Sequence, residues 1–163
     1  MRFIGRPLLV PLLGFGALCF ALLATWSQMP QRVASHFDIH GKPDGWATRE
    51  EYLVTLLSLA AITIAIVLGI FLMVKLTVFA HEKSEAGKPQ NGKDTARALW
   101  RLGCEVGGGV CLFLAGTHLM VVRANASSEP RLGFGIYILA GIFLTLIALR
   151  ARALLSGAGA GAR

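Results

Sequence analysis

Residues 53–74 read LVTLLSLAAITIAIVLGIFLMV, a run of 22 residues without a charged side chain. At about 1.5 Å of rise per residue, an α-helix of this length covers a hydrocarbon core of about 30 Å. In the whole chain of 163 residues, 55% are hydrophobic and only 15% are charged, whereas a soluble domain carries roughly a quarter charged residues. The apolar residues also come in blocks, which is typical of an integral membrane protein.

Three further apolar blocks of about 20 residues each lie at residues 8–26, 102–122 and 132–149. The sequence therefore predicts an all-α integral membrane protein with four transmembrane helices in a single domain, residues 1–155. Between the helices we expect an extracytoplasmic loop at 28–51 and a cytoplasmic linker at 81–96, the latter rich in Gly, Lys, Pro and Asn. A Gly/Ala tail at 156–163 is expected to be disordered.

The basic residues indicate an orientation for these helices. Eleven Lys and Arg fall on one predicted side, and five fall on the other: Arg32, Lys42, Arg49, Arg123 and Arg131. Because cytoplasmic segments carry the excess of Lys and Arg, we expect both termini in the cytoplasm and the 28–51 loop outside. The net charge of +7 then reflects residues that flank membrane helices, and nucleic-acid binding is not expected.

The outer loop contains the main candidates for a metal site. His36, Asp38, His40 and Asp44 lie within nine residues of one another, and imidazole and carboxylate groups suit Zn²⁺ or another divalent ion. His118 falls near the outer end of the third helix and could lie beneath the loop. The alternative is that these residues have structural roles. Asp44 in Lys-Pro-Asp-Gly would serve a turn, and His118 would form a hydrogen bond to a neighbouring helix.

The third apolar block holds further polar residues. Arg101 and Glu105 are four residues apart on one helix face and are expected to pair, with a proton or ion relay as the alternative. Asn125, at the outer end, could close over the loop site. The spacing Gly103-x-x-x-Gly107 favours close approach of another helix.

The start of the second helix is marked in the sequence. Thr48-Arg49-Glu50-Glu51 stands directly before the apolar run and has the spacing of a capping box. We therefore expect Thr48 to cap the helix and Glu51 to reach back to it.

Enzyme signatures are missing from the sequence. It contains no HExxH, no GxSxG and no phosphate-binding glycine loop, so no catalytic residue is assigned. The cysteines Cys19, Cys104 and Cys111 lie inside apolar blocks without CxxC spacing, which favours packing roles over a disulfide framework.

The loop also carries a family motif: Pro30, Val33, His36, Phe37, Gly41, Asp44, Trp46 and Arg49. It resembles the N-terminal domain of unknown function of SdpI-type membrane proteins, the immunity proteins against the sporulation-delaying toxin. The hallmark of that family is Leu-Pro-x-x-Ile-Pro-x-His-Phe, then Gly, then Asp-x-Trp or Tyr and a basic residue, directly after a first membrane helix. Met29 and Ala34 depart from it, and the resemblance covers about Leu8 to Leu72.

The resemblance implies a multi-pass protein of the bacterial inner membrane with an outward His-Gly-Asp loop and, in SdpI-type proteins, a role in toxin immunity and signalling. We therefore expect a non-enzymatic protein of the lipid bilayer whose loop recognises a peptide toxin or a membrane-protein partner through His36, Phe37, Gly41, Asp44 and Trp46. One alternative is a metal site at the outer surface, catalytic or sensing, made of His36, Asp38, His40 and His118. Another is an accessory subunit of a larger membrane complex.

Overall fold

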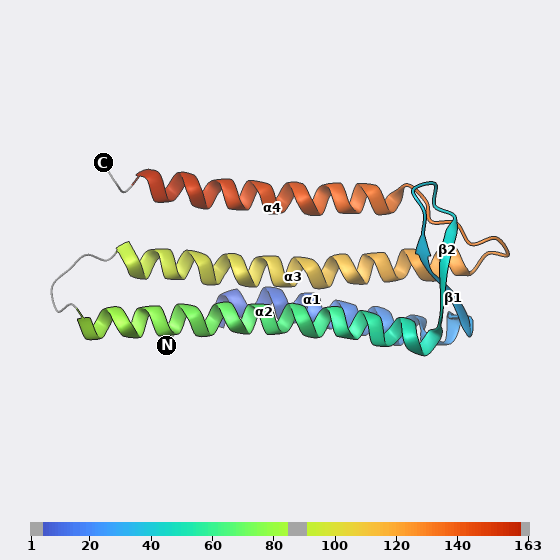
Figure 1. Cartoon of the computed structure of the whole chain (residues 1–163), viewed down its shortest axis with the longest axis horizontal. Helices are drawn as coiled ribbons and strands as arrows, with labels where there is room; N and C mark the ends of the chain where they lie inside the picture. Colours follow the sequence, from blue (N-terminus) through green and yellow to red (C-terminus); the bar gives the residue numbers. More distant parts are fainter. Residues whose placement is uncertain (1–4, 85–90, 161–163) are drawn as a thin grey trace.

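The computed structural model describes residues 5–84 and 91–160, which form four long helices, a short 3₁₀ helix and one β-hairpin (Figure 1). In chain order the elements are α1 (Gly5–Thr25), η1 (Trp26–Gln28), β1 (Arg32–Phe37), β2 (Pro43–Thr48), α2 (Arg49–Ser84), α3 (Asn91–Asn125) and α4 (Gly135–Ala160). The helices run side by side, and α3 is central because it contacts each of the other three. The hairpin lies across one end of this bundle.

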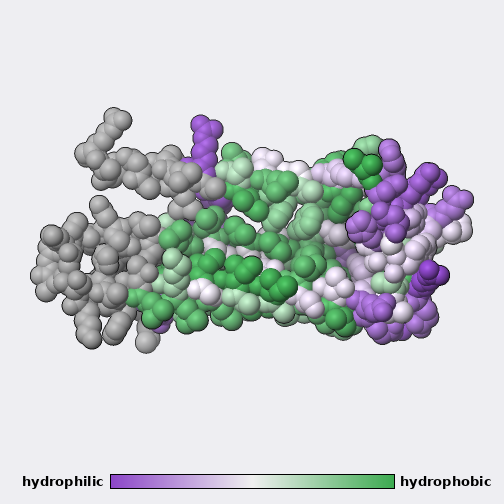
Figure 2. Space-filling model, in the orientation of Figure 1, coloured by the Kyte–Doolittle hydropathy of each residue, from purple (hydrophilic) through white to green (hydrophobic). Residues whose placement is uncertain are grey.

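Three helices are long and apolar enough to cross a membrane, over Pro7–Gln28, Arg49–Leu76 and Ala98–Asn125. The apolar part of α4, Gly135–Arg150, is shorter than these three, so the fourth predicted span at 132–149 is a shorter apolar helix. Figure 2 shows the consequence at the surface: apolar side chains cover the helices, and polar side chains gather at the hairpin end. The mostly helical, membrane-type architecture predicted from hydropathy is confirmed.

The helices extend beyond the apolar blocks. Where a linker was predicted at 81–96, α2 continues to Ser84 and α3 begins at Asn91; residues 85–90 lie outside the described part. Where disorder was predicted from residue 156, α4 continues to Ala160, and residues 161–163 lie outside the described part. The helical ends are consistent with local composition, because α4 contains no proline to stop it and alanine is the best helix former.

The predicted loop between the first two membrane helices is an antiparallel β-hairpin, which corrects the purely helical prediction. Its paired residues are Arg32 with Thr48, Val33 with Ala47, Ala34 with Trp46, His36 with Gly45, and Phe37 with Pro43. The register shifts on both sides of His36, as at a β-bulge. In β1, Val33 and Ala34 are fully buried, so the first half of the strand belongs to the protein core.

The junction of β2 and α2 is a capping box, as predicted. The backbone N–H of Glu51 donates to Thr48 Oγ1 at 3.1 Å, and the backbone N–H of Thr48 donates to Glu51 Oε2 at 2.8 Å. These reciprocal bonds satisfy two N–H groups at the helix start. They also fix the direction in which the hairpin leaves α2.

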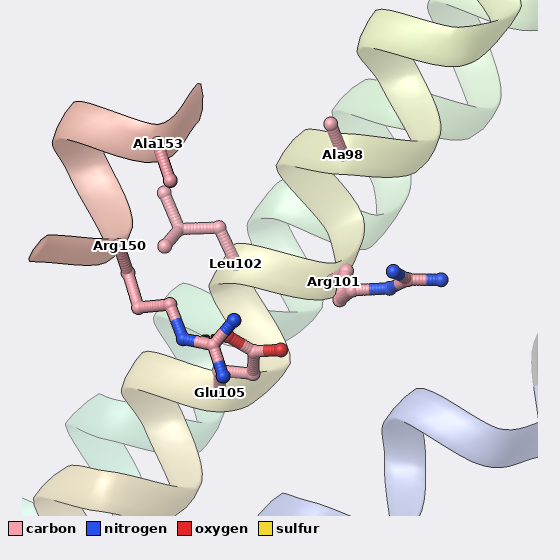
Figure 3. A pocket seen from close by; sticks show the side chains of 6 residues that line it. All are labelled: Ala98, Arg101, Leu102, Glu105, Arg150 and Ala153. Atoms are coloured by element: carbon pink, nitrogen blue, oxygen red, sulfur yellow. Dashed lines mark ion pairs between the residues drawn. The ribbon is translucent and has the colours of Figure 1, made fainter. Parts of the chain in front are cut away.

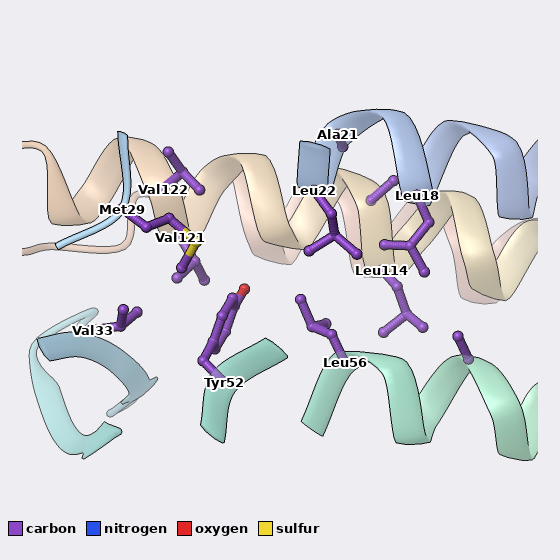
Figure 4. Close-up of a cluster of buried hydrophobic side chains, with 12 residues drawn as sticks. Leu18, Ala21, Leu22, Met29, Val33, Tyr52, Leu56, Leu114, Val121 and Val122 are labelled. Carbon is purple, nitrogen blue, oxygen red and sulfur yellow. The ribbon is translucent and has the colours of Figure 1, made fainter. Parts of the chain in front are cut away.

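One hydrophobic cluster joins the hairpin to three helices (Figure 4). Its members come from α1, β1, α2 and α3 and include Leu18, Leu22, Val33, Tyr52, Leu56, Leu114 and Val121. Within the membrane, such side chains stabilise the bundle through van der Waals packing between the helices. The hairpin is therefore packed as part of the same core as the helix ends beneath it.

Close helix contacts in the bundle depend on glycine. A Cβ atom placed on Gly14 of α1 would overlap the carbonyl oxygen of Gly108 in α3. On another face of α3, Gly103 lies against Ile70 and Gly107 against Val67, both in α2. The close approach predicted from Gly103-x-x-x-Gly107 is thus confirmed, and Gly108 provides a second one toward α1.

Candidate functional site

The hairpin turn is organised by Asp38. Its carboxylate Oδ1 accepts hydrogen bonds from the backbone N–H groups of His40 and Lys42, both at 2.8 Å, and its carbonyl accepts from Gly41 N–H at 2.9 Å. Gly41 has a φ of 74°, which glycine adopts without strain. The bond from Lys42, followed by that from His40, lowers the pKa of Asp38 below its ordinary value, because both stabilise the carboxylate.

His36 and Asp44 form a cross-strand pair on the exposed side of the hairpin. Nδ1 of His36 lies 2.5 Å from Oδ1 of Asp44. Gly45 lies opposite His36, and a Cβ there would come within 2.8 Å of the histidine Cβ. Asp44 lies within β2, so the turn role expected for it is filled by Asp38 and Gly41 instead.

Two tryptophans are covered by arginines near the base of the hairpin. The guanidinium of Arg32 lies 5.4 Å from the ring centre of Trp46, and that of Arg49 lies 4.4 Å from the ring of Trp26. Such cation–π contacts contribute about 0.5–1 kcal/mol at exposed sites. Trp46 nevertheless remains 46% exposed, so a large aromatic face is held in place at the surface.

The outer edge of β1 is closed by a side chain from α3. Oδ1 of Asn125 accepts from the backbone N–H of Ala34 at 2.8 Å, and Nδ2 donates to the carbonyl of Ala34 at 3.1 Å. Nδ2 also donates to the carbonyl of Val121 at 2.9 Å. The amide of Asn125 thus pairs with Ala34 as a residue of a neighbouring strand would.

The hairpin tip is tied to the start of α4. The backbone N–H of Leu132 donates to the carbonyl of Gly41 at 2.9 Å, and the hydroxyl of Tyr137 donates to the carbonyl of Ile39 at 2.9 Å. A Cβ on Gly41 would overlap the carbonyl oxygen of Leu132. Two features therefore require glycine at position 41: its backbone conformation and this close contact.

His118 is fully buried beneath the hairpin, where it joins three helices. Its Nε2 lies 2.8 Å from Thr25 Oγ1 of α1, and its Nδ1 lies 3.3 Å from the hydroxyl of Tyr52 of α2. Thr25 donates its own hydroxyl proton to the carbonyl of Ala21, so it accepts from His118. The pattern assigns the proton to Nε2 and makes Nδ1 the acceptor for Tyr52.

The structure does not bring the predicted metal ligands together. Across residues 5–84 and 91–160, no group of three or more His, Cys, Asp or Glu side chains is arranged to hold a metal ion. The physical reason is that each candidate has another contact: His118 bonds helices α1 and α2, Asp38 organises the turn, and His36 pairs with Asp44. His40 is exposed and lies in the turn. In the described residues, His36, Asp38, His40 and His118 are therefore not arranged as one set of ligands, and a bound metal stays a prediction.

The intramembrane carboxylate has a different partner from the one predicted. Glu105 Oε2 lies 3.3 Å from Nε of Arg150 in α4, whereas the side chain of Arg101 points away from Glu105 (Figure 3). The predicted pair within α3 is therefore replaced by a pair between α3 and α4. All three residues line a cavity between these helices.

The remaining predicted loop residues have structural places in the hairpin. Phe37 packs against the hydrophobic cluster, Gly41 is buried in the turn and Trp46 is exposed. Sequence reasoning missed Thr25 and Tyr52. Each is a polar group at a helix end next to an apolar block, but only the fold shows that both meet His118.

The long apolar helices and the apolar surface that they expose indicate a helical membrane protein. A family model described as a domain of unknown function (DUF1648) matches residues 13–64, which cover most of α1, the hairpin and the first part of α2. No curated protein and no solved structure matches the chain significantly. The matched segment contains the hairpin, and its contacts Asn125 and His118 come from α3, outside the match.

Proposed function

We propose that the chain is a multi-pass protein of a bacterial inner membrane whose hairpin faces outward and recognises a polypeptide partner. The resemblance to SdpI-type proteins supports toxin immunity or signalling as the role. The proposed recognition is non-enzymatic: the hairpin binds its partner without a chemical step. A membrane-protein partner would contact the same surface and would co-purify with the chain.

The observation that carries this proposal is the combination of a fixed backbone with exposed side chains. The hairpin is held by Asn125 at β1, by Glu51 at the base and by Leu132 at the tip. Ile39 is 80% exposed, and Trp46 is 46% exposed. A surface that is already ordered loses little conformational entropy on binding, and tryptophan is enriched among the residues that dominate binding energy.

The proposed orientation rests on the distribution of Lys and Arg and can be tested directly. With both termini in the cytoplasm, α4 makes a fourth crossing alongside α3. A green fluorescent protein fused after residue 163 should then fluoresce, and alkaline phosphatase fused after Gly133 should be active. An active phosphatase at the C-terminus would show that α4 does not cross and would reject this topology.

The recognition role is tested by protection of a sensitive bacterium against the sporulation-delaying peptide toxin. Cells expressing the chain should survive the toxin, and the double substitution His36→Ala with Asp44→Ala should abolish survival. Leu144→Ala, on an exposed apolar face of α4, is the matched control and should protect fully. Expression is compared by immunoblot. Equal protection by the double variant would rule out this surface, and no protection by the natural sequence would rule out immunity to this toxin.

A further inference from the structure

A cavity of about 200 Å³ lies between α3 and α4, toward the end of the bundle opposite the hairpin (Figure 3). Its lining residues are Ala98, Arg101, Leu102, Glu105, Arg150 and Ala153. The space exists because alanine stands on both helices where a larger side chain would fill it. The lining thus combines charged groups with a small apolar wall.

The charged groups of this cavity have a defined arrangement. Glu105 is largely buried, with 28% of its side chain exposed, and it holds the guanidinium of Arg150 through Nε at 3.3 Å. Arg101 also lines the cavity and adds a second positive charge from α3, with its side chain directed away from Glu105 (Figure 3). The lining therefore holds two arginines and one carboxylate, and this net positive charge favours an anionic ligand.

The cavity also lies at a defined depth. The apolar stretch of α3 begins at Ala98, and that of α4 ends at Arg150. Both residues line the cavity, which therefore lies where the apolar surface ends. Phospholipid head groups lie at this level of a bilayer, and basic pockets between membrane helices bind anionic head groups.

We propose that this cavity binds the phosphate head group of an anionic phospholipid. Arg150, positioned by Glu105, and Arg101 attract the phosphate, and arginine matches phosphate geometry well. The acyl chains extend along the exposed apolar side chains of α4, among them Leu146 and Leu149. This site is independent of partner recognition by the hairpin.

The test compares lipid binding by the whole protein in detergent, measured by native mass spectrometry with phosphatidylglycerol and phosphatidylcholine added in turn. Phosphatidylglycerol should bind at least about tenfold more tightly, since each arginine near the membrane surface contributes about a fivefold preference for anionic lipid. The double variant Arg101→Gln with Arg150→Gln should lose this preference. Arg131→Gln removes an arginine near the hairpin end and should keep it.

A second variant tests the cavity rather than the charge. Ala153→Leu fills the cavity without changing any charge and should also lose the preference. Gly141→Leu adds a side chain of the same final size where a Cβ meets no atom within 4 Å and should keep it. Glycerol 3-phosphate is the competitor that distinguishes a lipid site from a site for a free phosphate ester, and it should not displace the lipid. The proposal would be overturned if the natural protein and Ala153→Leu retained phosphatidylglycerol equally, or if the natural protein showed no preference for phosphatidylglycerol.

Discussion

Asn125 pairs with both backbone polar groups of Ala34, although the two residues are 91 positions apart in the chain. Ala34 is fully buried, so its N–H and carbonyl need protein partners. The side-chain amide of Asn125 provides them and is itself held by Val121. This contact attaches the hairpin to α3 and makes Asn125 the most informative single position for testing the fold.

Replacing Asn125 with alanine should loosen the hairpin. The two buried groups of Ala34 would lose their partners, at about 1–3 kcal/mol for each buried group left unpaired. The measurement is hydrogen exchange of the Ala34 amide in detergent micelles, which should accelerate at least about tenfold. Ser128→Ala, in the exposed connection after α3, is the control and should leave the exchange rate unchanged. An equally slow Ala34 amide in Asn125→Ala would show that the amide clamp is not needed.

The buried hydrogen-bond chain at His118 predicts a graded series of stabilities. Tyr52→Phe removes one bond inside the bundle, and interhelical bonds of this kind contribute about 0.6 kcal/mol on average, with a maximum near 1.7. His118→Ala should cost more, because it leaves the hydroxyl of Tyr52 without its acceptor, removes the donor to Thr25 and opens a cavity, with about 2–5 kcal/mol typical of large-to-alanine changes in cores. Unfolding in mixed micelles measures both. Tyr137→Phe removes an exposed bond and should have the smallest effect; a reversed order would contradict the assigned chain.

Two glycines only two residues apart in α1 should respond differently to the same substitution. Gly14→Ala places a methyl group against the backbone of Gly108 and should destabilise the packing of α1 on α3 by about 1–3 kcal/mol, as overpacking does. Gly16→Ala meets no atom within 4 Å and should be neutral or slightly stabilising, because alanine favours helix. Thermal unfolding in the same detergent compares the pair. Equal melting temperatures would argue against the close crossing.

The turn at Asp38 should weaken in acid. Because hydrogen bonds from Lys42 and His40 lower the pKa of Asp38 in the folded hairpin, folding favours the carboxylate. The contribution of this carboxylate to the stability of the hairpin is complete above the pKa of an unfolded aspartate, about 3.9. It is lost as the pH falls through the lower pKa of the folded state. The amide chemical shifts of His40 and Lys42 should follow this titration. Asp38→Asn keeps an acceptor oxygen and should remove the acidic titration step from these chemical shifts. If the step persisted in the variant, it would belong to another group.

Hydropathy and local motifs predicted much of the bundle. Long apolar blocks became helices because a helix satisfies its backbone hydrogen bonds within one segment in lipid, and the capping box at Thr48 and Glu51 needs only residues three positions apart. The hairpin was missed because β1 depends on Asn125, and no local pattern shows a partner from another helix. The same reason explains why the partner of Glu105 was predicted wrongly. Its sequence neighbour Arg101 stood at a suitable spacing, whereas its actual partner Arg150 comes from α4.

The metal hypothesis grouped residues that the described part of the fold does not gather into one set of ligands. Histidines and aspartates near one another in sequence were counted as one group, but His36 lies in β1, whereas Asp38 and His40 lie beyond it at the turn. Asp38 in the turn and His36 in β1 also serve different neighbours. The burial of His118 between Thr25 and Tyr52 could be learned only from the arrangement of three helices.

The bond between Asn125 and Ala34 has a consequence for biogenesis. During synthesis, α1, the hairpin and α2 leave the ribosome before α3 exists, so the outer edge of β1 is incomplete at that stage. The segment that matches the family, residues 13–64, also lacks the residues of α3 that complete its core. Insertion of α3 therefore finishes the hairpin, and a chain interrupted before Asn125 should expose an unpaired strand edge to the quality-control proteases of the membrane.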